Sequence, residues 1–237
     1  MDKKRYKLRE DLSIEFNGIK LFRIEAVEDI DNFGVKKGDI GGYIEKEDNL
    51  SENAWVSDSA WVYGNAMVYG SALVSGSAEV YGASRVYGNA RVYDNAEVFD
   101  RAKVYGNAAV FGRAEVFGVA WVAGDAKVYG NASVYDSAVV SKHAEVFGWA
   151  RVYGGARVCG DVVKSEKDCV NITNEKYNIT IMPEHLQIGC QYHSKKKWWG
   201  FSDSEILAMD GEPGLLWWKK WKSILMAVCE ESEGEDE

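Results

Sequence analysis

The three histidines and four cysteines of this 237-residue chain are the first residues to consider for metal binding or catalysis. His185, Cys190 and His193 form a compact set, and Cys169 precedes them. Imidazole and thiolate are the usual ligands of structural zinc, which needs about four of them. A single Cys-x-x-His spacing also occurs without any metal, when a buried cysteine is followed by a surface histidine. We therefore predict no metal site, and metal binding by this set stays an open question.

His143 is the candidate general base, because it lies inside a regular repeat where other units have Asn or Ser in a turn. A general base needs a defined geometry and a group that orients it. The sequence around His143 shows no obvious carboxylate for that purpose. No Ser/His/Asp arrangement and no phosphate-binding glycine loop is evident elsewhere. We predict no catalytic residue and no cofactor, and a protein that is more a binding protein than an enzyme.

The repeat around His143 organises the chain. A valine recurs at every sixth residue from Val56 to Val158, eighteen times without a gap. An alanine stands two residues before each valine, and Ser84 is the only substitute. The motif is A-x-V-[YF]-[GD]-[NS]. Self-similarity at a short fixed period is typical of solenoids.

Each hexad has the pattern of a minimal β-strand. Residues two apart on a strand point to the same side, so Ala and Val face inward and the residue between them faces outward. The Gly/Asp and Asn/Ser positions tolerate the positive φ that sharp turns need. Apolar residues six apart do not share one side of an α-helix. The pattern therefore predicts a mainly β fold with an apolar interior.

This pattern resembles the hexapeptide-repeat, left-handed parallel β-helix proteins, as Val62 with Ala66 and Val104 with Ala108 illustrate. The resemblance implies a left-handed triangular prism with three hexads in each turn, and eighteen hexads make six turns. The Val-Tyr-Gly-Asn-Ala units, with Tyr6-Lys7-Leu8, 36–44 and 188–190, resemble more closely a β-solenoid subgroup common in phage and prophage genomes. That subgroup implies a genomic setting more than an activity.

Many proteins that resemble this chain are acyltransferases with a catalytic histidine and a loop extruded from the coil. Here the register runs through every hexad without an insertion, so that loop is missing. Another branch is a zinc carbonic anhydrase with three histidine ligands. The zinc site of that branch cannot be transferred to this chain, because His185 and His193 lie outside the hexads. Acyl transfer from acyl-CoA remains an alternative, and it predicts that His143→Ala abolishes acetyl-CoA binding.

We divide the chain into four parts. Residues 1–53 form a small N-terminal β cap with a hairpin at Asn17-Gly18, a strong turn signal. Residues 54–161 form the hexapeptide β-helix. Residues 162–229 form an α+β C-terminal segment, in which Ser202 and Glu205 have the spacing of a helix capping box. Residues 230–237 form an acidic, disordered tail.

Because residues eighteen apart stack, the outward positions sort into faces. One face combines cations with large apolar side chains, and exposed apolar patches mark interaction sites. We predict a candidate interaction surface from this face, called the basic face below, together with three tryptophans of the last helix. Its residues are Met67, Arg85, Lys103, Trp121, Val139, Arg157, Trp217, Trp218 and Trp221. An adjacent face, the acidic face, stacks Glu79, Glu97 and Glu115, so the two faces could pair between subunits.

Composition and charge limit the kinds of partner that the chain could bind. The formal charge is −9, but six acidic residues lie in 230–237, so the rest carries about −3 (−9 + 6). No apolar run approaches a membrane span or a signal core, so we expect a cytoplasmic protein with free thiols. We expect a protein partner, such as a host enzyme that a phage protein inhibits, and allow a homo-oligomer through the faces. Membrane and nucleic acid are not expected; a sponge for a small nucleotide, held by Arg85 and Lys103, is a further alternative.

Overall fold

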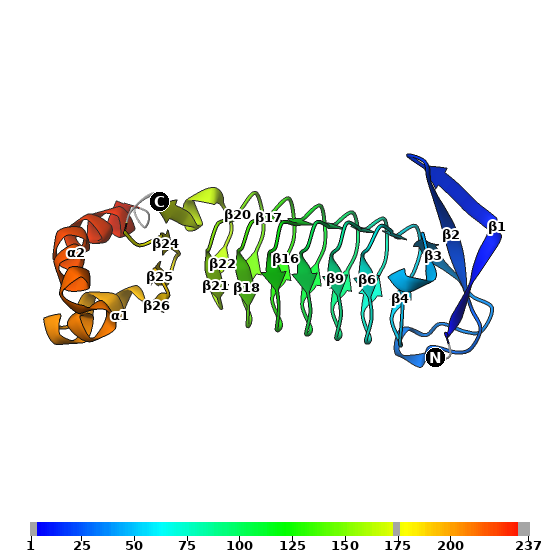
Figure 1. Ribbon diagram of the computed structural model, residues 1–237, viewed down its shortest axis with the longest axis horizontal. Helices are drawn as coiled ribbons and strands as arrows, with labels where there is room; N and C mark the ends of the chain where they lie inside the picture. Colours follow the sequence, from blue (N-terminus) through cyan, green and yellow to red (C-terminus); the bar gives the residue numbers. More distant parts are fainter. Residues whose placement is uncertain (1–3, 173–175, 232–237) are drawn as a thin grey trace. The chain divides into compact units, whose positions relative to one another are not determined.

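The computed structural model describes residues 4–172 and 176–231 (Figure 1). The predicted tail at 230–237 lies, from residue 232 onward, outside the described residues. The chain divides into two compact units, residues 1–166 and 167–237, and each is described by itself.

The first unit is mainly β and stacks about seven parallel coils into a solenoid (Figure 1). Three parallel sheets run along it, one for each side of the coil. The first contains β3 (Ile40–Ile44), β5 (Trp61–Val62), β8 (Glu79–Val80), β11 (Glu97–Val98), β14 (Glu115–Val116), β17 (Ser133–Val134) and β20 (Arg151–Val152). The second contains β6 (Met67–Val68), β9 (Arg85–Val86), β12 (Lys103–Val104), β15 (Trp121–Val122), β18 (Val139–Ser141) and β21 (Arg157–Cys159). The third contains β4 (Trp55–Val56), β7 (Leu73–Val74), β10 (Arg91–Val92), β13 (Ala109–Val110), β16 (Lys127–Val128), β19 (Glu145–Val146) and β22 (Val162–Val163).

The hexad repeat produces this stack directly. All eighteen repeat valines are fully buried, and the alanines two residues before them are buried with them. Burial of each valine side chain contributes about 1.5–3 kcal/mol before the loss of chain entropy is subtracted. Ser84 fits the alanine position because its hydroxyl donates to the carbonyls of Tyr81 and Val98, at 2.8 and 3.1 Å. The parallel solenoid predicted from the sequence is confirmed, and its left-handed sense stays a prediction from the resemblance.

The solenoid starts one coil earlier than the hexad count of six turns. Ile44 pairs with Val62 and Leu50 with Val68, so an inward apolar residue already recurs every six positions before the first repeat valine. The count missed this coil because it carries Ile and Leu in place of Val and no A-x-V unit. Asn49 stands directly before Leu50, where the repeat has its outward residue, but it is fully buried and its side-chain amide donates to the carbonyl of Ala66 at 2.8 Å.

The N-terminal hairpin extends the first sheet beyond its first coil. β1 (Tyr6–Phe16) and β2 (Ile19–Ala26) are antiparallel, and β2 pairs with β3. The predicted turn at Asn17-Gly18 is confirmed, with φ of 49° and 78°. Short 3-10 turns follow at η1 (Asp31–Phe33) and η2 (Glu47–Asn49), and η3 (Glu166–Asp168) comes after the last coil. The hairpin therefore pairs the sheet edge that the first coil would otherwise expose, which is a known aggregation hazard.

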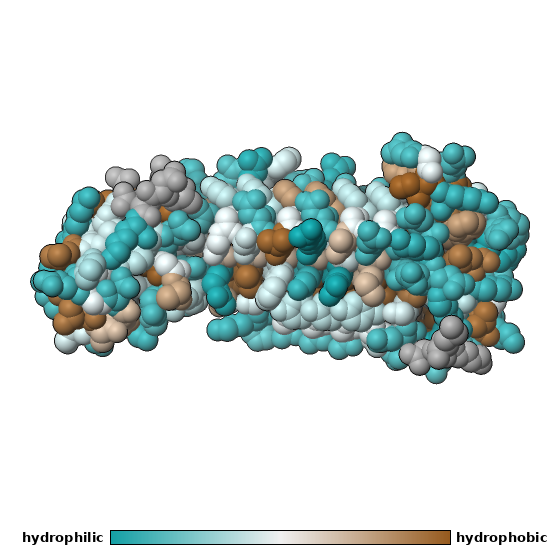
Figure 2. Space-filling model, viewed as in Figure 1, coloured by the Kyte–Doolittle hydropathy of each residue, from teal (hydrophilic) through white to brown (hydrophobic). Residues whose placement is uncertain are grey.

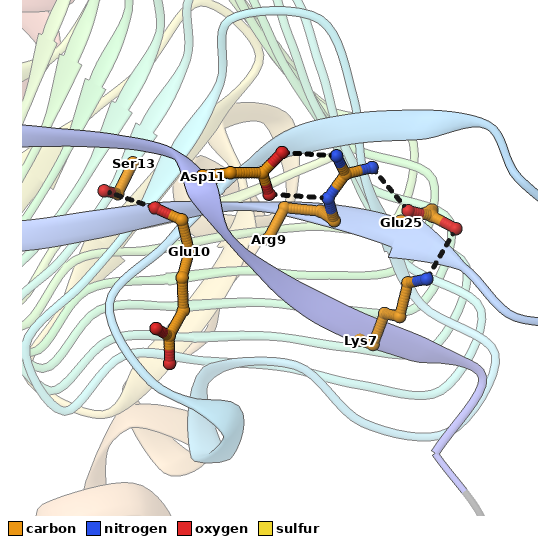
Figure 3. A network of polar contacts seen from close by, with 6 residues as sticks. All are labelled: Lys7, Arg9, Glu10, Asp11, Ser13 and Glu25. Atoms are coloured by element: carbon orange, nitrogen blue, oxygen red, sulfur yellow. Dashed lines mark hydrogen bonds and ion pairs between the residues drawn. The ribbon is translucent and has the colours of Figure 1, made fainter.

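Two local features fix this hairpin. Gly42 lies so close to the coil that a β-carbon there would come within 2.7 Å of the Ala60 carbonyl oxygen. At the outer edge, Arg9 binds Asp11 and Glu25 at the bulge of β1, and Lys7 binds Glu25 at 2.8 Å (Figure 3). The bond from Arg9 holds the pKa of the Asp11 carboxyl below its usual range. These charges on a long edge strand discourage pairing with another chain.

The second unit is α+β, as the sequence predicts. A four-stranded antiparallel sheet contains β23 (Val170–Ile172), β24 (Ile179–Ile181), β25 (His185–Ile188) and β26 (Gln191–Ser194). Helix α1 (Lys195–Gly200) follows β26, and the Ser194 hydroxyl caps its N-terminus by accepting a hydrogen bond from the Lys197 N–H. Helix α2 (Asp203–Glu231) begins at the predicted capping box and is broken at Asp210 and Gly211.

Candidate interaction surface

The basic face is a continuous row of outward side chains on the second sheet. The strand pairings place Met67, Arg85, Lys103, Trp121, Val139 and Arg157 next to one another in that order. The eighteen-residue stacking predicted from the sequence is therefore confirmed for the six solenoid members of the candidate surface. Three of them carry a positive charge and three are apolar.

Lys103 and Trp121 form the centre of the basic face. The Lys103 ammonium lies 4.8 Å from the centroid of the Trp121 ring, which is within the range of a cation–π contact. The Trp121 side chain is 41% exposed and Met67 is 40% exposed, while Val139 is half-buried. Figure 2 shows that, on the visible side of the solenoid, hydrophobic groups are separate and surrounded by more hydrophilic surface. The row thus presents an amphipathic strip on a rigid, flat support.

An aromatic stack borders the lower half of the basic face. Tyr69, Tyr87 and Tyr105 are stacked at centroid distances of 4.9 and 5.0 Å. The stack stops at Ala123, which is buried, and Ser141 and Cys159 follow it with their hydroxyl and thiol 3.3 Å apart. Because Ala123 and Ser141 carry no ring, the side chains that border Trp121 and Val139 are smaller than the tyrosine that borders Lys103.

The acidic face lies on the adjacent sheet. Glu79, Glu97 and Glu115 are direct strand neighbours, so their carboxylates stack at about the 4.8 Å spacing of a sheet. The Tyr63 hydroxyl donates to Glu79 at 3.1 Å, and the Tyr81 hydroxyl donates to Glu97 at 3.0 Å. Burial, followed by the charge of Glu97, raises the pKa of the Glu79 carboxyl above its usual value. The folded chain therefore holds the charge of Glu79 at an energetic cost.

Two charges of opposite sign pair with each other on the third face. Lys127 binds Glu145 of the next coil at 2.9 Å, and this bond lowers the pKa of the Glu145 carboxyl. The Tyr129 hydroxyl also donates to Glu145, at 3.3 Å. Trp55, at the lower end of the same face, is buried. This face thus lacks the single-sign rows of the other two.

The three tryptophans predicted for the same surface belong to the second unit. Trp218 is only 4% exposed and lies in the core of that unit against Trp198, with ring centroids 5.3 Å apart. Trp217 and Trp221 are half-buried and stacked on each other at 5.6 Å. Their position three to four residues apart on a helix is equally typical of core packing, which is the role that Trp218 has.

The histidines and cysteines are placed as follows. Asp125, which the sequence reasoning missed, lies one coil before His143, with its carboxylate 3.5 Å from the His143 Nδ1. The eighteen-residue spacing could have revealed this pair. The His143 side chain is 83% exposed, so water surrounds the imidazole. In the second unit, His193 packs edge-on against Trp198 and Phe201, and Cys190 is exposed in a turn. Within residues 4–172 and 176–231, no three His, Cys, Asp or Glu side chains are grouped to hold a metal ion.

Coils, sheets and faces together define a β-solenoid repeat protein. Consistent with this, the family model for the YdcK beta solenoid repeat matches residues 60–76, 84–98 and 126–142, all within the solenoid. No curated protein matches the chain. Over the ranges that the structure describes, no helix has the length and apolarity needed to cross a membrane.

Proposed function

We propose that this chain is a non-enzymatic binding and assembly protein that docks a macromolecule on its basic face. The observation that carries this proposal is Trp121, exposed beside Lys103 in a row with Met67 and Val139. Tryptophan, methionine and arginine are enriched in protein interfaces, and buried aromatic anchors supply much of the binding energy. A solenoid face holds these side chains in place, so little entropy is lost when a partner binds.

The partner that we propose is a protein. The resemblance to phage and prophage solenoids supports a phage origin, with a host or phage macromolecule as the target, for example a defence or metabolic enzyme that the chain inhibits. The compartment that we propose is the bacterial cytoplasm. A partner that fits the basic face carries carboxylates beside an apolar pocket, because three cations there need neutralising when water is removed.

The test compares two exposed tryptophans. Tagged wild-type chain and the Trp121→Ser and Trp149→Ser variants are incubated in bacterial lysate, and the bound proteins are quantified by mass spectrometry. Trp149 is 72% exposed and lies in a turn after β19, so it is a matched control. We expect Trp121→Ser to lose the bound protein and Trp149→Ser to keep it. Equal binding by all three chains would refute docking through the basic face.

The His143–Asp125 pair supports one alternative, acyl transfer, because a carboxylate at Nδ1 is the group that orients a general base. This alternative predicts that the chain binds acetyl-CoA and that His143→Ala abolishes that binding. Calorimetry with acetyl-CoA that shows no heat of binding to the wild-type chain would remove it.

A further inference from the structure

Two adjacent faces of the solenoid carry opposite charges at matching heights. Each residue of the acidic face is followed six positions later by its counterpart on the basic face, as Glu79 is by Arg85 and Glu97 by Lys103. Six residues are one third of a coil, so the members of a pair differ in height by roughly 1.6 Å, a third of the strand spacing. A second copy lying beside the first and pointing the same way brings its Arg85 and Lys103 level with Glu79 and Glu97.

The charges on these two faces are not balanced within one chain. Lys127 and Glu145 on the third face form an ion pair between successive coils. By contrast, across 4–172 and 176–231 Glu97, Arg85 and Lys103 form no ion pair with one another or with other residues. Like charges stacked on adjacent strands destabilise a sheet. Each row of charges would be stabilised by a row of opposite charges with the same spacing.

We propose that the protein docked on the basic face is a second copy of this chain, which presents its acidic face in parallel orientation and occupies the surface in place of a host or phage target. This inference rests on the proposed function, in which the basic face is the docking surface. The levels above the ion pairs are compatible with it. Trp121 of one copy lies opposite Glu115 of the other, and Val139 lies opposite Ser133. In the last coil Arg157 lies opposite Arg151, which Glu166 of its own chain already binds at 3.1 Å. The cation that Arg157 approaches is therefore neutralised within its own chain.

Contacts between identical faces are disfavoured. Two basic faces would bring six cations together (3 + 3), and two acidic faces would bring together six carboxylates (3 + 3) from their glutamates. A contact between unlike faces generates a ring of three or more copies or an open chain, and not a two-fold dimer. Phe16 packs on Trp61 with ring centroids 4.8 Å apart, so the hairpin occupies the lowest level of the acidic face. The contact therefore begins at Glu79.

The test is a charge exchange on the full chain, read by light scattering after size exclusion at low salt. We expect the wild type to elute as an assembly of three or more copies. Glu97→Lys and Lys103→Glu should each weaken association at least about tenfold, because each sets like charges together. The double variant restores the opposite signs and should reassemble. Arg91→Glu makes the same charge change on the third face and should leave the assembly intact; circular dichroism checks that every variant is folded.

A monomeric wild type, a double variant that stays dissociated, or equal disruption by Arg91→Glu would overturn the inference. Its failure is distinguishable from failure of the proposed function. A monomer that still captures another protein, and loses it with Trp121→Ser, keeps the docking face and rejects the second copy as its partner. A monomer that captures nothing through Trp121 rejects both.

Discussion

Substitution of Asp94 tests how the turns hold the coils together. Asp94 occupies a turn position that is otherwise mostly glycine, with a φ of 61°. Its carboxylate accepts a hydrogen bond from the backbone N–H of Gly112 in the next coil, at 3.1 Å. Asp58, Asp100 and Asp136 do the same for the coils above them. Aspartate thus offsets its unfavourable backbone conformation with a bond that glycine cannot make.

The expected changes in the free energy of unfolding follow from the hydrogen bond of Asp94 and from its backbone conformation. Asp94→Ala loses the hydrogen bond, worth about 1 kcal/mol, and keeps a left-handed conformation that costs a residue such as alanine about 1 kcal/mol more. We expect a loss of about 2 kcal/mol, or roughly 4–8 °C in melting temperature for a domain of this size. Asp94→Gly loses the bond but relieves the backbone, so the two terms nearly cancel. Its stability should lie within about 0.5 kcal/mol of wild type.

Thermal and urea denaturation followed by circular dichroism measure these differences. Ala83 is the matched control, because it lies in a turn and its φ is not positive. There glycine should be less stable than alanine, by about 0.5–1 kcal/mol. The reasoning is refuted if Asp94→Ala is as stable as Asp94→Gly, or if both positions rank glycine and alanine in the same order.

Three further predictions concern other parts of the chain. Phe111→Ala should destabilise the solenoid by about 1–3 kcal/mol in urea denaturation, because two ring stacks at 4.8 Å are lost, whereas Phe111→Tyr should match wild type. The raised pKa of Glu79 means that its charged form destabilises the fold at neutral pH and ceases to do so once acid protonates it. Glu79→Gln should therefore raise the melting temperature at pH 7 and lose this advantage below the ordinary carboxyl pKa; an equal gain at both pH values contradicts this. Trp218→Ala should cost the second unit about 3–5 kcal/mol, whereas Leu216→Ala, at a site 63% exposed, should stay within about 0.5 kcal/mol when unfolding is followed by tryptophan fluorescence.

The hexad pattern was sufficient to predict the solenoid and the order of residues on its basic face. A six-residue repeat whose coils stack every eighteen residues fixes which side chains are neighbours. The sequence therefore predicts that Lys103 lies beside Trp121, as the structure has it. The first coil was missed because Ile44 and Leu50 fill the valine position without the rest of the motif. A search for any aliphatic residue at the sixth position would have found it.

Side-chain contacts outside the repeat were harder to predict. The role of Trp218 depends on how α2 packs on the sheet of its own unit, and helical spacing alone does not distinguish a core stripe from an exposed one. The break in α2 at Gly211 was predictable, because glycine and the following Pro213 both disfavour a continuous helix. Contacts made within the repeat can be predicted from spacing, and contacts between irregular elements cannot.

Photocrosslinking from the basic face tests the docking claim most directly. A photoreactive phenylalanine analogue replaces Val139 in one variant and Ala109 in another; both are half-buried, outward strand residues, on the basic face and the third face respectively. After irradiation in bacterial cells, adducts are measured by gel and mass spectrometry. We predict adducts from position 139 and none above background from position 109, with twice the mass of the chain when a second copy is the partner. Adducts from position 109 alone, or none from position 139, would contradict a docking surface on the basic face.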